Sequence, residues 1–251
     1  MVNLKEERLK FIKTSAQPEY VRSNRMFELV IFDWDGTLAD TLGVIVLAFQ
    51  RVLSKIGCNV SDEFLERRIG IGARNMFKEA LETAKIRYDE RMIDKLLEEK
   101  TRVHLTLTPK IRLFDGAVNL LEALKPAVKM ALATMSNRKV IEKTLREKEI
   151  RGYFDYIITA DEVKKPKPDP EAFLRCAKAL GCKPERCIVI EDSIFGVIAA
   201  RRAGMRCIAI SSGFYSRSDL EREGPDLIVN SLKEKDKILT YILGKDEQYY
   251  D

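Results

Sequence analysis

Short, uninterrupted runs of hydrophobic residues recur along the chain, each about as long as a β-strand. The first run, LVIF at residues 29–32, ends at an aspartate. A strand in which every residue is apolar is typical of a parallel sheet covered by helices on both faces. We therefore predict strands over residues 29–32, 130–134, 156–159, 187–191, 207–210 and 226–229.

Helical patterns separate most of these runs. They predict helices over residues 116–125, 138–149, 170–181, 194–203 and 232–243. An alternation of buried strands and helices indicates an α/β fold with a doubly wound, Rossmann-like parallel sheet.

Residues 42–107 interrupt the alternation, because they contain no convincing strand and instead show helical patterns punctuated by glycines. We predict a small inserted α-helical domain there, with residues 28–41 and 108–251 forming the α/β core. Residues 1–27 form a basic, partly amphipathic extension. We expect this extension to pack on the domain or to fray, the alternative being a helix that binds a partner or a membrane surface.

The composition is that of a globular protein with a highly charged surface, since 45% of the residues are hydrophobic and 33% are charged. No apolar run reaches the roughly 20 residues of a membrane span, and the charged N-terminus lacks the apolar region of a secretory signal. We therefore expect a cytoplasmic monomer or homodimer with no membrane partner. The net charge of +5 suits a small anionic substrate but is too diffuse to indicate nucleic acid.

Cysteine and histidine chemistry is not expected here. The five cysteines are scattered, no C-x-x-C occurs, and His104 is the only histidine, so the sequence favours reduced thiols over zinc or disulfides. A Ser-His or Cys-His mechanism would have to use His104, which lies in a helical stretch and is expected to be structural.

Acidic, hydroxyl and basic side chains follow several of the predicted strands. The carboxyl ends of parallel strands meet at one edge of the sheet, where α/β proteins bind ligands. The residues expected at this edge are Asp33, Asp35, Thr134, Glu191, Asp192 and, from the loop KKPKPDP, Lys165.

Paired carboxylates at such an edge suggest a bound cation and phosphate chemistry. Two charges ~4 Å apart cost roughly 4 kcal/mol at an effective dielectric of ~20, and few, hard oxygen ligands favour Mg²⁺. Asp33 could act as a nucleophile, Asp35 as a general acid and base, and Lys165 as a charge partner for a phosphoryl group. Each residue alone also fits a surface turn, a helix cap or a solvated lysine; it is their joint placement that favours chemistry.

Four ordered motifs in this chain resemble those of the haloacid dehalogenase-like phosphatase superfamily, over about residues 27–243. DWDGTLAD (33–40) is similar to the first motif, and ALAT (131–134) to the second. KPKPD (165–169) is similar to the third, and VIEDSIFGVIAARRAGM (189–205) to the fourth. The helical segment at 42–107 matches the position of the helical cap in this family.

The resemblance implies a role for each residue at the sheet edge. Asp33 would be the nucleophile and a Mg²⁺ ligand, while Asp35 would be the general acid and base and would offer its backbone carbonyl to Mg²⁺. Thr134 would bind the phosphate of a small phosphorylated metabolite.

Three further residues complete the implied site. Lys165 would stabilise the phosphoryl oxygens and Asp192 would bind Mg²⁺, while Glu191 would act through the metal or its waters. A cap would close over these residues, exclude water and select the substrate.

Within this superfamily, an acid at position 35 favours phosphoryl transfer over dehalogenation. The cap segment RIGIGARNMFKEAL (68–81) resembles phosphoglycolate phosphatases, whereas the EDSxxG form of the fourth motif is shared with β-phosphoglucomutase-like proteins. We interpret the chain as a phosphatase, with a sugar phosphate mutase as the alternative and a non-catalytic binding protein as a third hypothesis. Arg68 and Arg74 are candidates for binding a substrate carboxylate or a second phosphate, the alternative being a solvated helix face.

Overall fold

A six-stranded parallel sheet forms the centre of the molecule in the computed structural model, which describes residues 26–244. The strand order is β5-β4-β1-β6-β7-β8, and this confirms the predicted fold class. The strands are β1 (Leu29–Phe32), β4 (Lys129–Ala133), β5 (Tyr156–Ile158), β6 (Cys187–Glu191), β7 (Arg206–Ile210) and β8 (Leu227–Val229).

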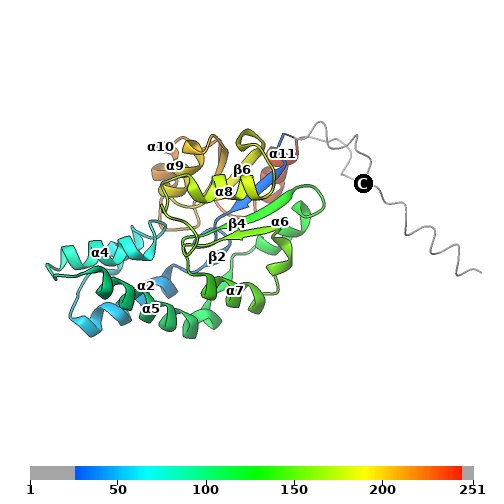
Figure 1. Ribbon diagram of the computed structural model, residues 1–251. Coiled ribbons are helices and arrows are strands. Elements are labelled where there is room, and N and C mark those ends of the chain that lie inside the picture. The colour runs from blue at the N-terminus through cyan, green and yellow to red at the C-terminus, as the bar shows by residue number, and fades with distance from the viewer. Residues whose placement is uncertain (1–25, 245–251) are drawn as a thin grey trace, which may run out of the picture.

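Helices cover both faces of the sheet, and this explains why its strands are continuously apolar. In β1, Val30 and Phe32 pack in one hydrophobic cluster with α6, α7 and α11, whereas Leu29 and Ile31 pack in a second cluster with α8, α9 and α10. Figure 1 shows α8, α9 and α10 on one side of the strands and α6 and α7 on the other. The helices are α6 (Ala117–Leu124), α7 (Arg138–Glu147), α8 (Glu171–Ala179), α9 (Ile194–Arg202), α10 (Arg217–Arg222) and α11 (Lys235–Leu243).

The segment at 42–107 is helical, and none of its residues lies in a strand. Its hydrophobic side chains form a third cluster, in which the rings of Phe49 and Phe77 lie 4.7 Å apart. Figure 1 shows α2, α4 and α5 grouped at one end of the sheet. These helices are α2 (Leu42–Leu53), α3 (Asp62–Glu66), α4 (Ala73–Thr83) and α5 (Glu90–Leu107).

Several short elements were not anticipated. Strands β2 (Ala39–Asp40) and β3 (Arg112–Leu113) pair antiparallel where the chain enters and leaves the helical segment. The short helix α10 was not predicted, although it starts with a capping box between Ser216 and Asp219. The described part of the chain also contains four 3-10 turns: η2 (Ser54–Ile56), η3 (Thr108–Lys110), η4 (Arg151–Tyr153) and η5 (Pro184–Arg186).

Other expectations have mixed outcomes. All five cysteines are buried and free, as expected. Within residues 26–244, no helix has both the length and the apolar character needed to cross a bilayer. The predicted extension at 1–27 lies almost wholly outside the described residues; of its last two residues, Phe27 is buried and stacks on Tyr241.

An unusual buried pair, Lys100 and His104, lies on α5. The Lys100 Nζ is 3.3 Å from the His104 Nδ1 and 5.3 Å from the centre of the Phe49 ring, with no ion pair to an acid found within the described residues. Burial lowers the pKa of Lys100 to about 8, against the attraction of Asp35 and Asp161. Burial also lowers the pKa of His104 to about 2, so this residue is neutral and is a poor general base.

We expect Lys100→Met to raise the free energy of unfolding at pH 7 by about 1–3 kcal/mol, because a buried ammonium without an acidic partner costs stability. In the unfolded chain, Lys100 keeps its proton up to its ordinary pKa of 10.5, whereas in the folded protein Lys100 loses this proton near pH 8. The cost is therefore fully present below about pH 8 and fades as the pH rises toward 10.5. Urea denaturation at pH 7 and pH 10 measures both effects.

Lys95→Met is the matched control, since Lys95 lies on the same helix but is exposed. Its effect should stay within about 0.5 kcal/mol at both pH values. A Lys100→Met protein that is less stable than the wild type at pH 7 would contradict the prediction.

Candidate active site

Asp33 and Asp35 lie in the turn that follows β1, at the carboxyl edge of the sheet. The Asp33 backbone N–H donates to the Ile190 carbonyl at 3.0 Å, which continues the pairing of β1 with β6 by one residue. Gly36 follows with φ of 86°, a conformation that side-chain-bearing residues rarely adopt. The turn therefore places the two acids on the edge where β6 also ends.

Lys167 is the lysine that meets these acids. Its Nζ lies 2.6 Å from the Asp33 Oδ1, 2.6 Å from the Glu191 Oε1 and 3.2 Å from the Ala133 carbonyl oxygen. The side chain of Lys167 is 1% exposed, so its ammonium group contacts these partners and not bulk water. Although burial lowers it, the carboxylates of Asp33 and Glu191 hold the pKa of Lys167 above its ordinary value.

The prediction of Lys165 at the site is therefore wrong in its position. Lys165 is exposed, and its backbone N–H donates to the Glu171 carboxylate at 2.9 Å. Glu171, at the start of α8, also accepts from the Lys164 N–H, which fixes this part of the loop on the outside of the molecule. Two residues later the chain has turned inward, and Lys167 enters the core.

Both carboxylate oxygens of Glu191 accept hydrogen bonds from the protein. Its Oε1 accepts from Lys167, and its Oε2 accepts from the Asp192 N–H, the Ser193 N–H and the Ser193 Oγ at 2.9–3.0 Å. A Cβ at Gly196 would lie 1.8 Å from the Glu191 Cδ, so only glycine leaves room for this carboxylate. Glu191 therefore anchors Lys167.

Asp192 is enclosed by two glycines. Its Oδ1 accepts from the Thr37 hydroxyl at 2.9 Å. A Cβ at Gly36 or at Gly213 would lie 2.2 Å or 1.8 Å from the Asp192 Oδ2. The Ser212 hydroxyl donates to the Gly36 carbonyl at 2.7 Å and ties the two glycine-containing loops together.

The cluster carries more negative than positive charge. Oxygens of Asp33, Glu191 and Asp192 lie within 4.8 Å of one another, and Lys167 is the single cation in contact with them among residues 26–244. Burial, followed by the neighbouring carboxylates, raises the pKa of Asp192 well above its usual range, and burial does the same for Asp33 despite Lys167. Since hard oxygens with uncompensated charge are the ligands that divalent cations prefer, the cluster fits a metal ion.

Asp35 points to a different set of partners. Its Oδ2 accepts from the Ser136 hydroxyl at 2.7 Å and from the Thr134 hydroxyl at 3.1 Å, and its buried Oδ1 has no hydrogen-bond partner within residues 26–244. The side chain of Asp35 is thus not part of the acidic cluster. Thr134 is fully buried and in this state donates to Asp35.

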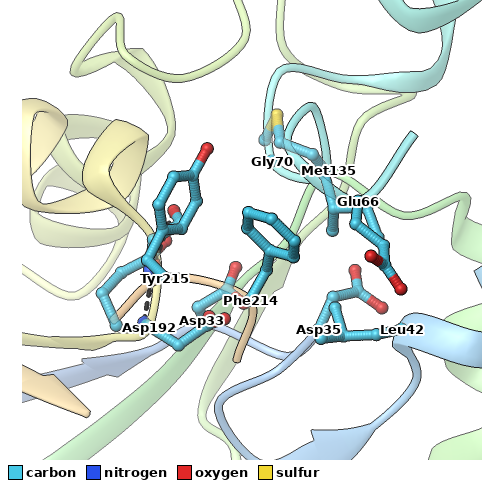
Figure 2. A pocket seen from close by; sticks show the side chains of 12 residues that line it. Asp33, Asp35, Leu42, Glu66, Gly70, Met135, Asp192, Phe214 and Tyr215 are labelled. Atoms are coloured by element: carbon cyan, nitrogen blue, oxygen red, sulfur yellow. Dashed lines mark hydrogen bonds between the residues drawn. The ribbon is translucent and has the colours of Figure 1, made fainter. Parts of the chain in front are cut away.

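A pocket opens above the acids, between the sheet edge and the helical segment (Figure 2). From the sheet side come Asp33, Asp35, Asp192, Met135, Phe214 and Tyr215, and from the helical segment come Leu42, Glu66, Ile69 and Gly70. The Tyr215 hydroxyl donates to the Arg67 carbonyl at 2.7 Å and so joins the two sides.

The two candidate arginines do not line this pocket. Arg68 donates to Glu79 at 2.6 Å and stacks on the Phe64 ring at 3.6 Å. Arg74 pairs with Glu90 and Asp94 on α5. Their alternative interpretation, as part of the charged surface of the helices, agrees with these contacts.

Sequence reasoning missed four residues of the site. Lys167 shares the KPKP pattern with Lys165, and only the direction of the loop separates them. Ser136 lies two residues after Thr134. Glu66 is the last residue of the short helix α3 and Tyr215 lies in a loop, and neither position carries a sequence signal for the pocket.

Comparisons with known proteins agree with this geometry. A family model described as haloacid dehalogenase-like hydrolase matches residues 30–210. Phosphoglycolate phosphatase 1 of Pseudomonas aeruginosa is 31% identical over 88% of this chain and 82% of its own. A phosphorylated carbohydrates phosphatase of Thermotoga maritima is 33% identical over 82% of this chain and 99% of its own. The crystal structure of a β-phosphoglucomutase from Clostridium difficile has a TM-score of 0.75 at 28% identity, covering 86% of this chain and all of that one (100%).

We expect Lys167→Met to lower kcat for phosphate-ester hydrolysis by on the order of 10²–10³-fold, because the substitution removes the cation that faces Asp33. Lys165→Met is the matched control, two residues away on the outer side of the same loop, and should stay within about twofold of the wild type. Steady-state phosphate release compares the two variants. Equal losses of activity in the two variants would show that Lys165 also acts in the site and would contradict the prediction.

We expect Gly196→Ala to lower the free energy of unfolding by about 1–3 kcal/mol, because its Cβ would displace the Glu191 carboxylate. In Gly43→Ala, on exposed α2 surface, the added methyl meets nothing within 4 Å. That control should gain up to about 1 kcal/mol from helix propensity. Thermal denaturation of both variants tests the contrast, and equal stability would refute the steric argument.

Proposed function

The chain belongs to the haloacid dehalogenase-like hydrolase family and is a phosphatase, and we propose that it hydrolyses the monophosphate ester of a small metabolite, with Mg²⁺ as its cofactor, through an aspartyl-phosphate at Asp33. The observation that carries the proposal is the buried Asp33 carboxylate, with one oxygen 2.6 Å from the Lys167 ammonium and Asp192 beside it. A carboxylate held in this way is a nucleophile in a site that attracts phosphate oxygens.

Asp33 and Asp192 would hold the metal ion, together with the backbone carbonyl of Asp35 that the family resemblance implies. Mg²⁺, when bound, supplies positive charge to the phosphate oxygens and offsets the excess negative charge of the cluster. Glu191 is a weaker candidate for a ligand, since both of its oxygens already accept hydrogen bonds from the protein.

Hydrolysis then proceeds in two displacements. In the first, the Asp33 carboxylate oxygen forms a bond to phosphorus and the ester oxygen leaves, taking a proton from the carboxylic acid of Asp35. In the second, a water attacks the aspartyl-phosphate and gives its proton to Asp35, which releases phosphate and regenerates Asp33. To act in this way, Asp35 must exchange its contacts with Thr134 and Ser136 for the substrate, which frees the Thr134 hydroxyl to donate to phosphate.

We further propose that residues 42–107 act as a cap over this site. The contact between Tyr215 and the Arg67 carbonyl and the pocket residues that the segment supplies support this proposal. A cap in this position excludes bulk water from the phosphoryl group and contacts the leaving group.

A sugar phosphate mutase is the second candidate, favoured by the similarity to β-phosphoglucomutase. A mutase must hold a second phosphate group at the cap side while it reorients the bisphosphate. Among residues 26–244, no lysine or arginine lines the pocket on the cap side. This charge distribution favours hydrolysis over retention of a doubly phosphorylated intermediate.

Asp33→Asn should lower phosphate release by at least about 10³-fold, because the neutral amide cannot attack phosphorus. The experiment is a ³¹P NMR assay over phosphoglycolate, fructose 1-phosphate and β-glucose 1-phosphate. The wild type should release free phosphate with Mg²⁺ and lose this activity in EDTA. Asp115→Asn, at an exposed aspartate paired with Lys233, is the control.

Each alternative has its own outcome in this assay. Conversion of β-glucose 1-phosphate to glucose 6-phosphate without free phosphate would identify a mutase. Full activity of Asp33→Asn would overturn the mechanism, and a folded wild type that acts on no member of the panel would support the binding-protein hypothesis.

A further inference from the structure

One ionisable group of the pocket has no part in the proposed reaction. Glu66, the last residue of α3, lines the pocket opposite the acids of the sheet edge. Figure 2 shows its carboxylate directed toward Asp35 across the pocket. The other lining residues on this side are Leu42, Ile69 and Gly70, so Glu66 is the polar side chain that the helical segment offers to a leaving group.

The neighbouring cations are directed elsewhere and do not neutralise Glu66. Within residues 26–244, no hydrogen bond or ion pair involves its side chain. Arg67 donates to Glu63 and lies over the Phe214 ring, and Arg68 pairs with Glu79. The acceptor oxygens of Glu66 are therefore available to a ligand.

The other cations of the helical segment and the sheet edge do not reach the pocket surface. Lys78 pairs with Glu90, and Lys167 lies between Asp33 and Glu191. Lys100 is buried on α5, where it interacts with Asp35, and does not line the pocket. A substrate carboxylate on the leaving group would thus meet a carboxylate in a pocket whose lining contains no lysine or arginine among residues 26–244. Like charges placed together in this way repel each other, whereas a hydroxyl donates a hydrogen bond to a carboxylate.

We propose that Glu66 determines the substrate class of this site: it admits a neutral, hydroxyl-bearing leaving group, such as a sugar or polyol monophosphate, and rejects one with a carboxylate or a second phosphate. The proposal rests on the phosphatase function described above and selects between the sugar-phosphate and phosphoglycolate types. It also assigns Glu66 a substrate-binding role, since its acceptor oxygens bind the hydroxyls of the leaving group and so leave the phosphoryl group facing Asp33.

Glycerol 3-phosphate and 3-phosphoglycerate make a matched pair of probes, since they differ in a hydroxymethyl group against a carboxylate. The readout is kcat/KM where a probe is hydrolysed, and otherwise its Ki against the best substrate of the panel. The wild type should prefer glycerol 3-phosphate by at least about tenfold. Glu66→Gln should reduce this preference by about tenfold, and Glu66→Lys should reverse it.

Glu63→Gln is the matched control, because Glu63 lies on the same short helix but is exposed and paired with Arg67. It should leave the ratio of the two probes unchanged. An unchanged ratio in Glu66→Gln, or a wild type that binds 3-phosphoglycerate as well as glycerol 3-phosphate, would overturn the inference while leaving the phosphatase function intact. Failure of the function itself appears separately, as the absence of Asp33-dependent phosphate release from every substrate.

Discussion

The ammonium of Lys167, buried between Asp33 and Glu191, is the interaction on which the site depends. The acids beside Lys167 stabilise a charge that is removed from water, and this charge in turn stabilises acids that lie close together. Neither partner can therefore be changed alone. Three strand ends meet at this point, since Asp33 follows β1, Glu191 ends β6 and the Ala133 carbonyl ends β4. The parallel register of the sheet brings these groups to one level.

Glycines make room for the carboxylates that surround this lysine. Gly196 admits Glu191, and Gly36 with Gly213 admits Asp192, in each case because a methyl group would overlap the acid. The result is a rigid, negatively charged floor. Above it, the helical segment contributes mostly apolar wall and one further acid, Glu66. The floor, where phosphate and metal would bind, thus carries excess negative charge that Lys167 offsets only in part, and the roof adds the acid Glu66.

Much of this organisation is predictable from the sequence, because buried parallel strands are continuously apolar and the residues after them share one edge. This rule predicts the strands of the sheet and the meeting of Asp33, Glu191 and Asp192. The helical segment follows from its helical hydrophobic pattern and from the lack of strand-like runs in it. The choice between Lys165 and Lys167 does not, since both fit the spacing and only the outward anchoring of the loop by Glu171 separates them. Strands as short as β2 and β3 have no recognisable pattern, and a pocket wall such as Glu66 is defined by tertiary packing alone.

The loop after β7 belongs to both halves of the site. Gly213 leaves the space that Asp192 occupies, and two residues later Tyr215 holds the Arg67 carbonyl of the helical segment. A displacement of one end of so short a stretch of backbone is transmitted to the other. A change in this loop that makes room for a bulkier ester therefore also changes the space around Asp192, so that the choice of substrate and the proposed cation site are structurally coupled.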